Sequence, residues 1–554
     1  MRPLALWALL LVLPLLGQAQ SPPAAAVASA HPLATAAGHR IMAQGGNAFD
    51  AAVAVGAVLA VVEPYSSGLG GGGFWLLHRA ADGRQLMVDG RERAPLAARA
   101  DLYLDPGGQP IPAASIDGPR AAGIPGAPAA LVHLAEHFGR LPLETSLAPA
   151  IALARQGFEV DEPYRRMARF RLHALRASPA AARVFLSASK VPGPGARIHQ
   201  PDLADTLARL AAAGHDGFYA GPVAQALVAG VRSAGGIWRP EDLARYQVVE
   251  REPVRGTYGE LRVVSAALPS SGGTVLVEML NVLSGYDLPA LDAATRVHLG
   301  VEAMRRAYRD RALYMGDPDF VDVPGAMLLH PFYAAGLRAG IRRDRATPSA
   351  LLPGIATRTR PDHHTTHYSI LDREGNRVAA TLSINYPFGS GFMPAGTGVL
   401  LNDEMDDFVA RPGTPNVYGL VGAEANAIAP GKRMLSSMSP TFLEGPQRIA
   451  ILGTPGGSRI ITSVLLATLA FAQGADAQAL VSAPRYHHQY LPDEIQVEPR
   501  ALGAALAGRL EAMGHVVHRL ERPYGNMQAV TWDRIRQRVE AASDPRGIGA
   551  ATVR

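Results

Sequence analysis

Hydrophobic residues recur at a helical spacing over much of the first 340 residues. Residues 31–63 predict two helices separated by a Gly45-Gly46-Asn47 break, with Asn47 as the N-cap of the second helix. This second helix is so rich in Ala and Val, as far as Val62, that we expect it to be buried. Later helices are predicted at Ala127–His137, Leu147–Arg155, Arg165–Arg176, Leu203–Ala213, Gly272–Leu283 and Ala294–Tyr314.

Strand patterns separate and follow these helices. Phe74–His78 and Leu86–Asp89 predict a hairpin that turns at Asp82-Gly83, and residues 248–264 predict two short strands. Beyond residue 364 a strand, a turn and a second strand are predicted, followed by single strands and a helix. These elements are the strand from Tyr368, the turn at Glu374-Gly375-Asn376, the strands Gly396–Leu401 and Ile449–Leu452, and the helix Ile460–Ala472.

Four stretches show neither the helical spacing nor the strand alternation of hydrophobic residues. Residues 66–73 are too dense in glycine for a helix or a strand, and they match no nucleotide-binding fingerprint. Residues 345–364 are rich in Pro, Thr and Arg and predict a flexible linker that ends at Thr365. Residues 410–433 predict a lid with Tyr418 near its middle. The Gly453–Arg459 turn joins a strand to a helix, an arrangement that aims backbone N–H groups at an anion.

The composition is that of a folded globular protein, with 48% apolar and 18% charged residues. The 554 residues exceed the length of a single core, which is about 250–300 residues, so we expect one composite domain or two packed domains. The net charge of +5 is scattered and no basic run accompanies it, so nucleic acid is not an expected partner. The absence of cysteine excludes disulfides, thiol catalysis and cysteine-ligated zinc.

The first 19 residues have the three parts of a secretory signal peptide. Arg2 supplies the positive charge, Leu4–Leu16 the apolar run, and Gly17-Gln18-Ala19 the small residues that a signal peptidase reads. The apolar run is shorter than the ~20 residues of a membrane helix. We therefore expect cleavage near Ala19 and a periplasmic or secreted protein without stable membrane insertion. An uncleaved anchor is the alternative.

Thr365 is the candidate nucleophile because of its place at the start of a strand, directly after the predicted linker. If the chain is cut before Thr365, its new α-amino group can serve as the base for its own hydroxyl. An α-amino group has a pKa of about 7.7–8, so it titrates near neutrality. The hypothesis is a self-cleaving N-terminal-threonine hydrolase. The alternative is a Thr365-Thr366 pair selected for its strand propensity.

A second candidate is Arg91, which follows Gly90 at the end of the predicted hairpin. An arginine at a strand end can clamp a carboxylate with two parallel hydrogen bonds. The alternative is an ion pair with its neighbours Asp89 or Glu92.

The order of these motifs resembles the γ-glutamyltranspeptidases (glutathione hydrolases) of the N-terminal-nucleophile superfamily. The resemblance covers essentially the whole chain after the signal peptide, including residues 31–73 and Arg91-Glu92. The matching blocks after residue 364 are Thr365–Asp372, Gly389–Gly391, Leu400–Phe408, Pro415–Leu420, Leu435–Thr441, Gly453–Ile460 and Ser543–Arg546.

The resemblance implies an α+β fold, a four-layer αββα sandwich built from two subunits of one self-cleaved precursor. The cut falls between His364 and Thr365, which gives a large subunit of residues 20–364 and a small subunit of residues 365–554. The two subunits stay together as a heterodimer. The implied substrates are glutathione, related γ-glutamyl compounds, and acceptor amino acids or peptides, with no cofactor and no metal.

The resemblance also implies a role for each residue of the site. Thr365 forms the acyl ester, Ser383 orients the Thr365 hydroxyl, and Thr366 supports the N-terminus. Tyr418 gates the pocket. The implied oxyanion hole is Gly456 and Gly457, and the implied glutamyl-binding residues are Arg91, Ser436 and Ser437 for the carboxylate and Glu404, Asp407 and Asn385 for the ammonium.

Three positions depart from the family's usual residues, namely Gly90, Ser383 and Met434. None removes a functional group, so they affect the expected rate and substrate preference more than the class of reaction. Two other functions remain open. One is an N-terminal-threonine acylase of the cephalosporin or glutaryl type, and the other is an unprocessed, inactive binding relative. The His363, His364 and His367 group and the His487-His488 pair lack the spacing of a metal site.

Overall fold

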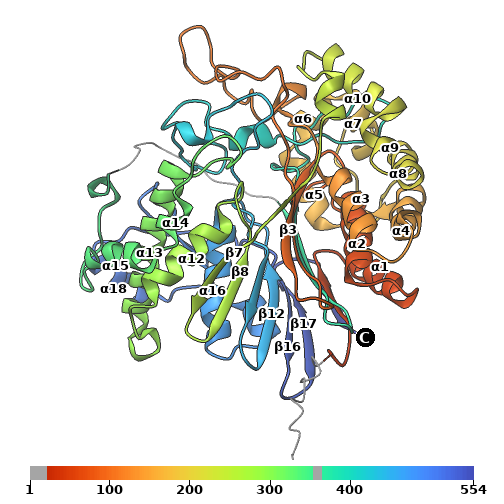
Figure 1. Ribbon diagram of the computed structural model, residues 1–554. Helices are drawn as coiled ribbons and strands as arrows, with labels where there is room; N and C mark the ends of the chain where they lie inside the picture. Colours follow the sequence, from red (N-terminus) through yellow and green to blue (C-terminus); the bar gives the residue numbers. More distant parts are fainter. Residues whose placement is uncertain (1–20, 354–364) are drawn as a thin grey trace, which may run out of the picture.

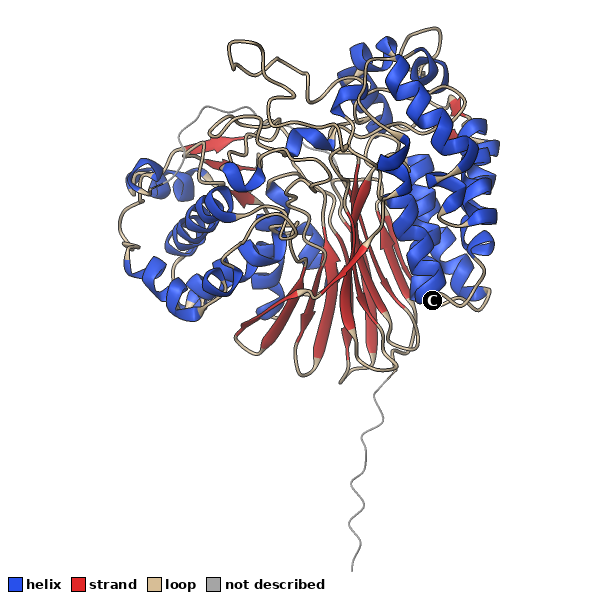
Figure 2. Cartoon of the chain, turned by 45° about the horizontal axis from the view of Figure 1, so that its top comes forward, coloured by secondary structure: helices blue, strands red, loops and turns tan. Residues whose placement is uncertain are grey.

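The computed structural model describes residues 21–353 and 365–554. Its centre is a pair of β-sheets packed face to face, each covered by helices on its outer side (Figures 1 and 2). The first sheet has, in order, β18 (Ala550–Val553), β1 (Ala26–Ser29), β9 (Thr366–Leu371), β10 (Arg377–Ser383), β2 (Gly72–His78), β3 (Gln85–Gly90) and β6 (Val249–Arg251). The second has, in order, β17 (Arg538–Ser543), β16 (Gln528–Asp533), β12 (Arg448–Gly453), β11 (Thr441–Glu444), β8 (Leu261–Ser265) and β7 (Val254–Tyr258).

The apolar faces of the two sheets form one core layer. Leu76 and Ala379 of the first sheet meet Phe442 and Val530 of the second, and all four side chains are fully buried. Each sheet also has an apolar outer face against helices, so the strand residues of β9 and β10 are all buried. The result is the four-layer αββα sandwich of the α+β class, as the resemblance implies.

The helices fall into two groups, one for each sheet. The group on the first sheet contains α1 (Pro32–Ala43), α2 (Ala48–Val62), α3 (Ala127–His137), α4 (Leu143–Gln156), α5 (Glu162–Phe170), α6 (Leu172–Ala177), α7 (Pro179–Phe185), α8 (Pro201–Ala213), α9 (Asp216–Tyr219), α10 (Gly221–Ser233) and α11 (Pro240–Ala244). The other contains α12 (Gly272–Leu283), α13 (Ala293–Tyr314), α14 (Gly325–Leu328), α15 (Pro331–Ala339), α16 (Arg459–Ala472), α17 (Ala477–Ser482) and α18 (Ala504–Ala512).

Helix α2 is the innermost helix of the first group. All fifteen of its residues are buried, and Asn47 caps it with a reciprocal bond to Asp50, as predicted. Two small sheets complete the fold, one of β4 (Phe158–Glu159) and β5 (Arg197–Ile198), the other of β13 (Tyr486–His487), β14 (Ile495–Val497) and β15 (Val517–Arg519). None of the helices in the described ranges is long and apolar enough to cross a bilayer.

Three predicted elements differ from the structure. Residues 396–401 are not a strand, because Gly396 and Gly398 adopt positive φ angles of 76° and 65° that no extended strand contains. The helix predicted at Arg165–Arg176 is broken at Arg171, where the backbone leaves the helical region, and forms α5 and α6. The two strands predicted at 248–264 are three, and β6 joins the first sheet while β7 and β8 join the second.

Part of the predicted linker is held against the body of the protein. The Ala346 amide donates to the Met513 carbonyl at 2.7 Å, and the Ser349 amide donates to Asp493 at 2.7 Å. Residues 349–351 form a short 3-10 helix. The predicted signal peptide, and His364 with the predicted scissile bond, lie outside the described residues.

Candidate active site

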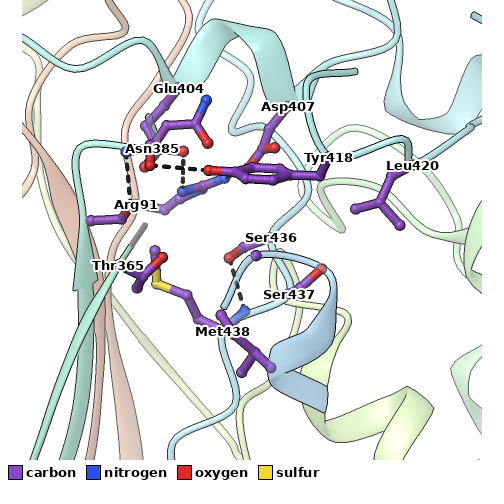
Figure 3. Close-up of a pocket in the computed structure, with 13 residues that line it drawn as sticks. Arg91, Thr365, Asn385, Glu404, Asp407, Tyr418, Leu420, Ser436, Ser437 and Met438 are labelled. Carbon is purple, nitrogen blue, oxygen red and sulfur yellow. Dashed lines mark hydrogen bonds and ion pairs between the residues drawn. The ribbon is translucent and has the colours of Figure 1, made fainter. Parts of the chain in front are cut away.

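A pocket of about 280 Å³ lies where the corresponding ends of both sheets meet. Its walls come from the end of β3, the start of β9, the segment after β10, the short 3-10 helix Glu404–Asp407 and the loop that precedes β11. Figure 3 shows the resulting arrangement. The lining residues are Arg91, Thr365, Ser383, Asn385, Glu404, Asp407, Tyr418, Leu420, Ser436, Ser437, Met438, Gly457 and Ile460.

Ten of the twelve residues that the sequence assigns to catalysis, binding or the lid line this pocket; Thr366 and Gly456 do not. Thr365 directly precedes β9 and is 7% exposed. Successive side chains of a strand point to opposite faces. Thr366 accordingly points away from the pocket, and its hydroxyl donates to the Glu63 carboxylate at 2.7 Å. The contact that supports the second threonine is therefore with the end of α2.

Burial raises the pKa of Glu63 to about 7, against the opposing effect of the Thr366 hydrogen bond. Tyr65 is its other nearby side-chain donor, at 3.5 Å. No arginine or lysine in the described residues forms an ion pair with Glu63. Its carboxyl group is therefore harder to ionise than an ordinary glutamate, and it contacts the residue that follows the candidate nucleophile.

Arg91 is fully buried between two acidic side chains. Its Nη1 donates to Glu404 at 2.7 Å and its Nη2 donates to Asp407 at 2.5 Å, while Nε donates to the Met434 carbonyl at 3.2 Å. The sequence analysis left open an ion pair of Arg91 with Asp89 or Glu92. The pair with Asp89 does not form, and the contact with Glu92 is longer than those with Glu404 and Asp407. The Arg91 amide, not its guanidinium, donates to Asp89 at 2.9 Å, and Glu92 lies 3.5 Å from Nη1.

The preceding glycine is required by packing. A Cβ at Gly90 would come within 2.8 Å of Trp75 and 2.9 Å of Ala130. A larger residue would therefore push the end of β3 away from the helix that covers it. This accounts for one departure from the family's usual residues.

Two of the acidic side chains around Arg91, Glu404 and Glu92, have raised pKa values. Burial and the neighbouring Asp407 charge raise the pKa of Glu404, while Arg91 and a hydrogen bond from Ser383 oppose that rise. Burial and the Glu404 charge likewise raise the pKa of Glu92. Ser383 is therefore engaged with the acidic cluster.

Two acceptors of residues that line the pocket are not satisfied within the described residues, Asn385 Oδ1 and Glu404 Oε1. Asn385 is held in a left-handed conformation, φ 69°, because its amide donates to Ser383 at 2.7 Å and its Nδ2 donates to the Asp403 carbonyl at 3.0 Å. Buried acceptors without donors are costly. A cationic ligand group with several N–H bonds would satisfy them.

The opposite wall is a loop with two serines. Ser436 accepts the Met438 amide at 3.1 Å, and its carbonyl accepts both the Ser271 amide at 2.9 Å and the Ser271 hydroxyl at 2.7 Å. The loop is thereby fixed to the segment before α12. Ser437, beside it, also lines the pocket.

The glycine turn, which contains Gly456 and Gly457, forms another part of the pocket wall through Gly457. Gly456 and Gly457 have φ angles of 144° and 54°, a backbone path that side chains disfavour. Their carbonyls accept the Arg459 and Ile460 amides at the start of α16. No acceptor in the described residues receives the Gly456 or Gly457 amide. These amides therefore have donor capacity left for an oxyanion.

The lid residue Tyr418 is buried over the pocket. Its hydroxyl donates to the Asn385 carbonyl at 3.0 Å, and its own carbonyl accepts Gln489 Nε2 at 3.2 Å. Asp406 holds the same segment through the Val417 amide at 2.8 Å. In this structure the predicted lid residue is thus packed against the pocket.

Only one group of three His, Cys, Asp or Glu side chains in the described residues is close enough to hold a metal ion, and it lies outside the pocket. It consists of His298, Glu302 and His515. Glu302 is already bound by Arg306 at 2.6 Å and by the Thr347 hydroxyl at 2.6 Å. The arginine charge and the occupied carboxylate make this group a poor cation site.

The sequence analysis did not find three of the residues that support the site. Glu63, Arg311 and Gln489 are buried and contact Thr366, Ser437 and the lid, respectively. Each lies in a different element from the residue that it contacts. The only sequence signal would have been the presence of charged or amide side chains in apolar stretches, as for Glu63 at the end of α2.

Comparisons with known proteins agree with this geometry. The family described as gamma-glutamyltranspeptidase matches residues 34–553. The glutathione hydrolase proenzyme of Pseudomonas sp. (strain A14) is 45% identical over 501 residues, which cover 88% of this chain and 85% of the relative.

Two solved structures are also similar. A cephalosporin acylase from Bacillus halodurans superposes with a TM-score of 0.83 at 28% identity and covers 96% of each chain. The γ-glutamyltranspeptidase of Helicobacter pylori has a TM-score of 0.58 at 39% identity and covers 59% of this chain and 94% of that chain. The sequence match extends over nearly the whole chain, and the chain therefore belongs to the γ-glutamyltranspeptidase family.

Proposed function

We propose that this enzyme hydrolyses and transfers γ-glutamyl groups of glutathione and related compounds through an ester on Thr365. One observation carries the proposal most directly. Thr365 lies at the head of β9 in a pocket that also holds the buried Arg91, Glu404 and Asp407 charges. A γ-glutamyl group carries one positive and one negative charge at its α-carbon, and it needs opposite charges in one site.

The reaction proceeds in two acyl-transfer steps. The Thr365 hydroxyl attacks the γ-carbonyl carbon while its α-amine takes the hydroxyl proton. The C–N bond then breaks, and the proton passes to the leaving amine. In the second step, water or an acceptor amine attacks the ester, the α-amine again takes the proton, and Thr365 regains it.

The glycine turn stabilises the charge that develops on the carbonyl oxygen. The Gly456 and Gly457 amides lie at the start of α16, where the helix dipole also favours negative charge. One donor of this kind is commonly worth about 10²–10³ in rate.

Recognition uses the acidic cluster and the serine loop. The α-ammonium of the donor binds Glu404, Asp407 and the open Asn385 oxygen, and the α-carboxylate binds the hydroxyls of Ser436 and Ser437. Arg91 is already bridged to both acidic residues in this structure. Arg91 therefore fixes the positions of the two carboxylates that bind the ammonium group. It also places a positive charge near the α-carboxylate of the donor.

Maturation uses the same hydroxyl. Thr365 attacks the carbonyl before it, and water hydrolyses the resulting ester to leave subunits of residues 20–364 and 365–554. The name proenzyme of the Pseudomonas relative supports a processed enzyme of two subunits. Export by the first 19 residues to the periplasm or outside the cell completes the proposal.

The acylase function is supported by one specific observation, the similarity to the Bacillus halodurans cephalosporin acylase. A glutaryl group has the carbon chain of a γ-glutamyl group but lacks its α-ammonium. The open acceptors at Asn385 and Glu404 favour the ammonium-bearing substrate.

A comparison of γ-glutamyl and glutaryl anilides tests this choice. We expect kcat/KM to be at least about 100-fold higher for the γ-glutamyl compound, because two buried acceptors are left unpaired by the other. Thr365→Ala should abolish both activities. A preference for the glutaryl compound would assign the acylase function instead.

A further inference from the structure

Arg311 of α13 lies behind the serine loop, with its guanidinium fully enclosed. Only 5% of the residue is exposed. Its Nε donates to the Ser271 hydroxyl at 2.9 Å and its Nη2 donates to the Ser437 hydroxyl at 3.3 Å. Within the described ranges it forms no ion pair with a carboxylate, unlike its helix neighbours Arg306 and Arg309.

A buried charge without an ion-pair partner is unfavourable because it has lost its hydration without compensation. Burial lowers the pKa of Arg311, and the nearby Arg91 charge acts in the same direction. The opposing attraction comes from Asp407, a pocket residue that is already bound to Arg91. Through its hydrogen bond to Ser437, which lines the pocket, the Arg311 charge lies next to the pocket, and no carboxylate of the described residues forms an ion pair with it.

The charged side chains that line the pocket balance when the adjacent Arg311 is counted with them; Glu92, 3.5 Å from Arg91, lies outside the lining and has a raised pKa. Arg91 contributes one positive charge, and Glu404 and Asp407 contribute up to two negative charges. Arg311 supplies the second positive charge. A donor with an α-ammonium and an α-carboxylate is itself neutral and fits a balanced site.

The hydrogen bonds from Arg311 also direct the serine hydroxyls. Since Arg311 donates to Ser437 Oγ, the proton of that hydroxyl is directed away from the guanidinium. Ser437 lines the pocket, so this proton is available to a ligand. Through Ser271, whose hydroxyl donates to the Ser436 carbonyl at 2.7 Å, Arg311 also fixes the backbone of Ser436.

We propose that Arg311 is a positioning residue that turns the serine loop into a carboxylate site and makes the enzyme selective for donors with an α-carboxylate. This rests on the proposed γ-glutamyl function and narrows its substrate class. The α-carboxylate binds the Ser437 hydroxyl, and Arg311 supplies the balancing charge through that hydroxyl without direct contact. Donors that lack the carboxylate leave the Arg311 charge uncompensated and are rejected.

The test compares two anilides, γ-glutamyl and 4-aminobutyryl, which differ only in the α-carboxylate. We expect Arg311→Met to lower the ratio of their kcat/KM values by about 10- to 100-fold, mostly through KM of the γ-glutamyl compound. Arg311→Lys keeps the charge but loses the two-armed geometry, so it should recover part of the ratio. An unchanged ratio in Arg311→Met, with both activities reduced equally, would show a merely structural role.

Three controls make the result specific. Ser437→Ala should lower the same ratio, and its combination with Arg311→Met should lower it less than the product of the two effects. Arg309→Met removes an arginine two residues away on α13 that is bound to Asp310, and it should leave the ratio unchanged. Variants are compared only after gel analysis and a melting curve show normal processing and folding.

A binding measurement keeps the inference testable if 4-aminobutyryl turnover is too slow to detect. Competitive inhibition by L-glutamate should weaken about 10- to 100-fold in Arg311→Met, while weak inhibition by 4-aminobutyrate should not change. Equal weakening of both would overturn the inference. If wild-type protein does not cleave the γ-glutamyl anilide, the proposed function fails. If it does cleave it, and Arg311→Met changes neither the ratio of the two kcat/KM values nor the ratio of the two inhibition constants, only the role of Arg311 fails.

Discussion

Glu63 illustrates how one buried residue gives the protein a measurable pH dependence. It is 4% exposed, its pKa is raised to about 7, and its hydrogen-bond partner Thr366 is the first residue of β9, directly after the candidate nucleophile Thr365. A carboxyl group whose folded pKa is raised keeps its proton in the folded state while the unfolded chain loses it. Its contribution to stability is therefore lost as pH rises from about 4.5 to 7 and is constant above that range.

We predict that Glu63→Gln removes this dependence. In the Thr365→Ala background, where no new terminal amine forms, the free energy of unfolding of the parent should fall by up to about 3 kcal/mol between pH 5 and 7.5 from this group. The variant with Glu63→Gln added should lose less over the same range. Denaturant unfolding at several pH values measures the difference, and parallel curves for the two proteins would contradict the prediction.

Arg91 holds the acidic cluster together in addition to its proposed role in substrate binding. Removing it leaves the Glu404 and Asp407 carboxylates buried without their partner. We predict that Arg91→Met costs about 3–5 kcal/mol of stability and raises KM for the γ-glutamyl anilide. Thermal unfolding and initial-rate kinetics measure the two effects. An unchanged KM in a folded variant would remove Arg91 from the substrate site.

The lid is an element whose position depends on residues far away in sequence. Gln489 accepts the Ser458 hydroxyl at 2.6 Å and donates to the Tyr418 carbonyl at 3.2 Å, so one side chain connects the lid to the end of the glycine turn. The Tyr418 hydroxyl adds the Asn385 contact on the other side. The predicted lid is thus held from two sides, by Asn385 and, through Gln489, by Ser458.

We predict that Gln489→Leu and Tyr418→Phe each change kcat/KM by about fivefold or more, because each removes at least one buried hydrogen bond. Limited proteolysis should cut residues 410–420 faster in both variants. Gln85→Leu is the matched control, since Gln85 is also 5% exposed. Gln85 lies at the start of β3, the end away from the pocket, and its side chain donates to Glu444 of β11. Equal proteolysis of the lid in all three variants would contradict the prediction.

Helices and strands could be predicted from the sequence wherever the hydrophobic residues follow either a helical or a strand spacing clearly. The α2 helix with its Asn47 cap and the strands around Asp82-Gly83 are confirmed because their local signals agree with their burial. The strand predicted at 396–401 failed because alternation there is overridden by two glycines in positive φ. Most of the pocket could be predicted from motifs, whereas Arg311 and Gln489 could not, because only the packing of α13 and the 486–490 segment places them near it.

At the scale of the whole molecule, the two sides of residue 364 are interleaved. The first sheet places β9 between β1 and β10, and the second places β8 beside β11, so each sheet contains strands from both sides of the predicted cut. The predicted cut lies just before β9 and not within a strand, so it breaks none of the backbone hydrogen bonds that join the strands. The predicted subunits therefore share one core.

We predict that cleavage leaves the two chains associated. Size-exclusion chromatography in native buffer should give one peak that contains both chains, and only denaturant should separate them. If the chains separate in native buffer, the interleaved sheets are not the stable form of the mature protein.

The central claim is that Thr365 becomes an N-terminal nucleophile. N-terminal sequencing and intact mass analysis of the purified protein test it most directly. The account predicts two chains, the smaller beginning at Thr365, and a single uncut chain in Thr365→Ala. An uncut wild-type chain that still cleaves γ-glutamyl anilide at full rate would contradict it.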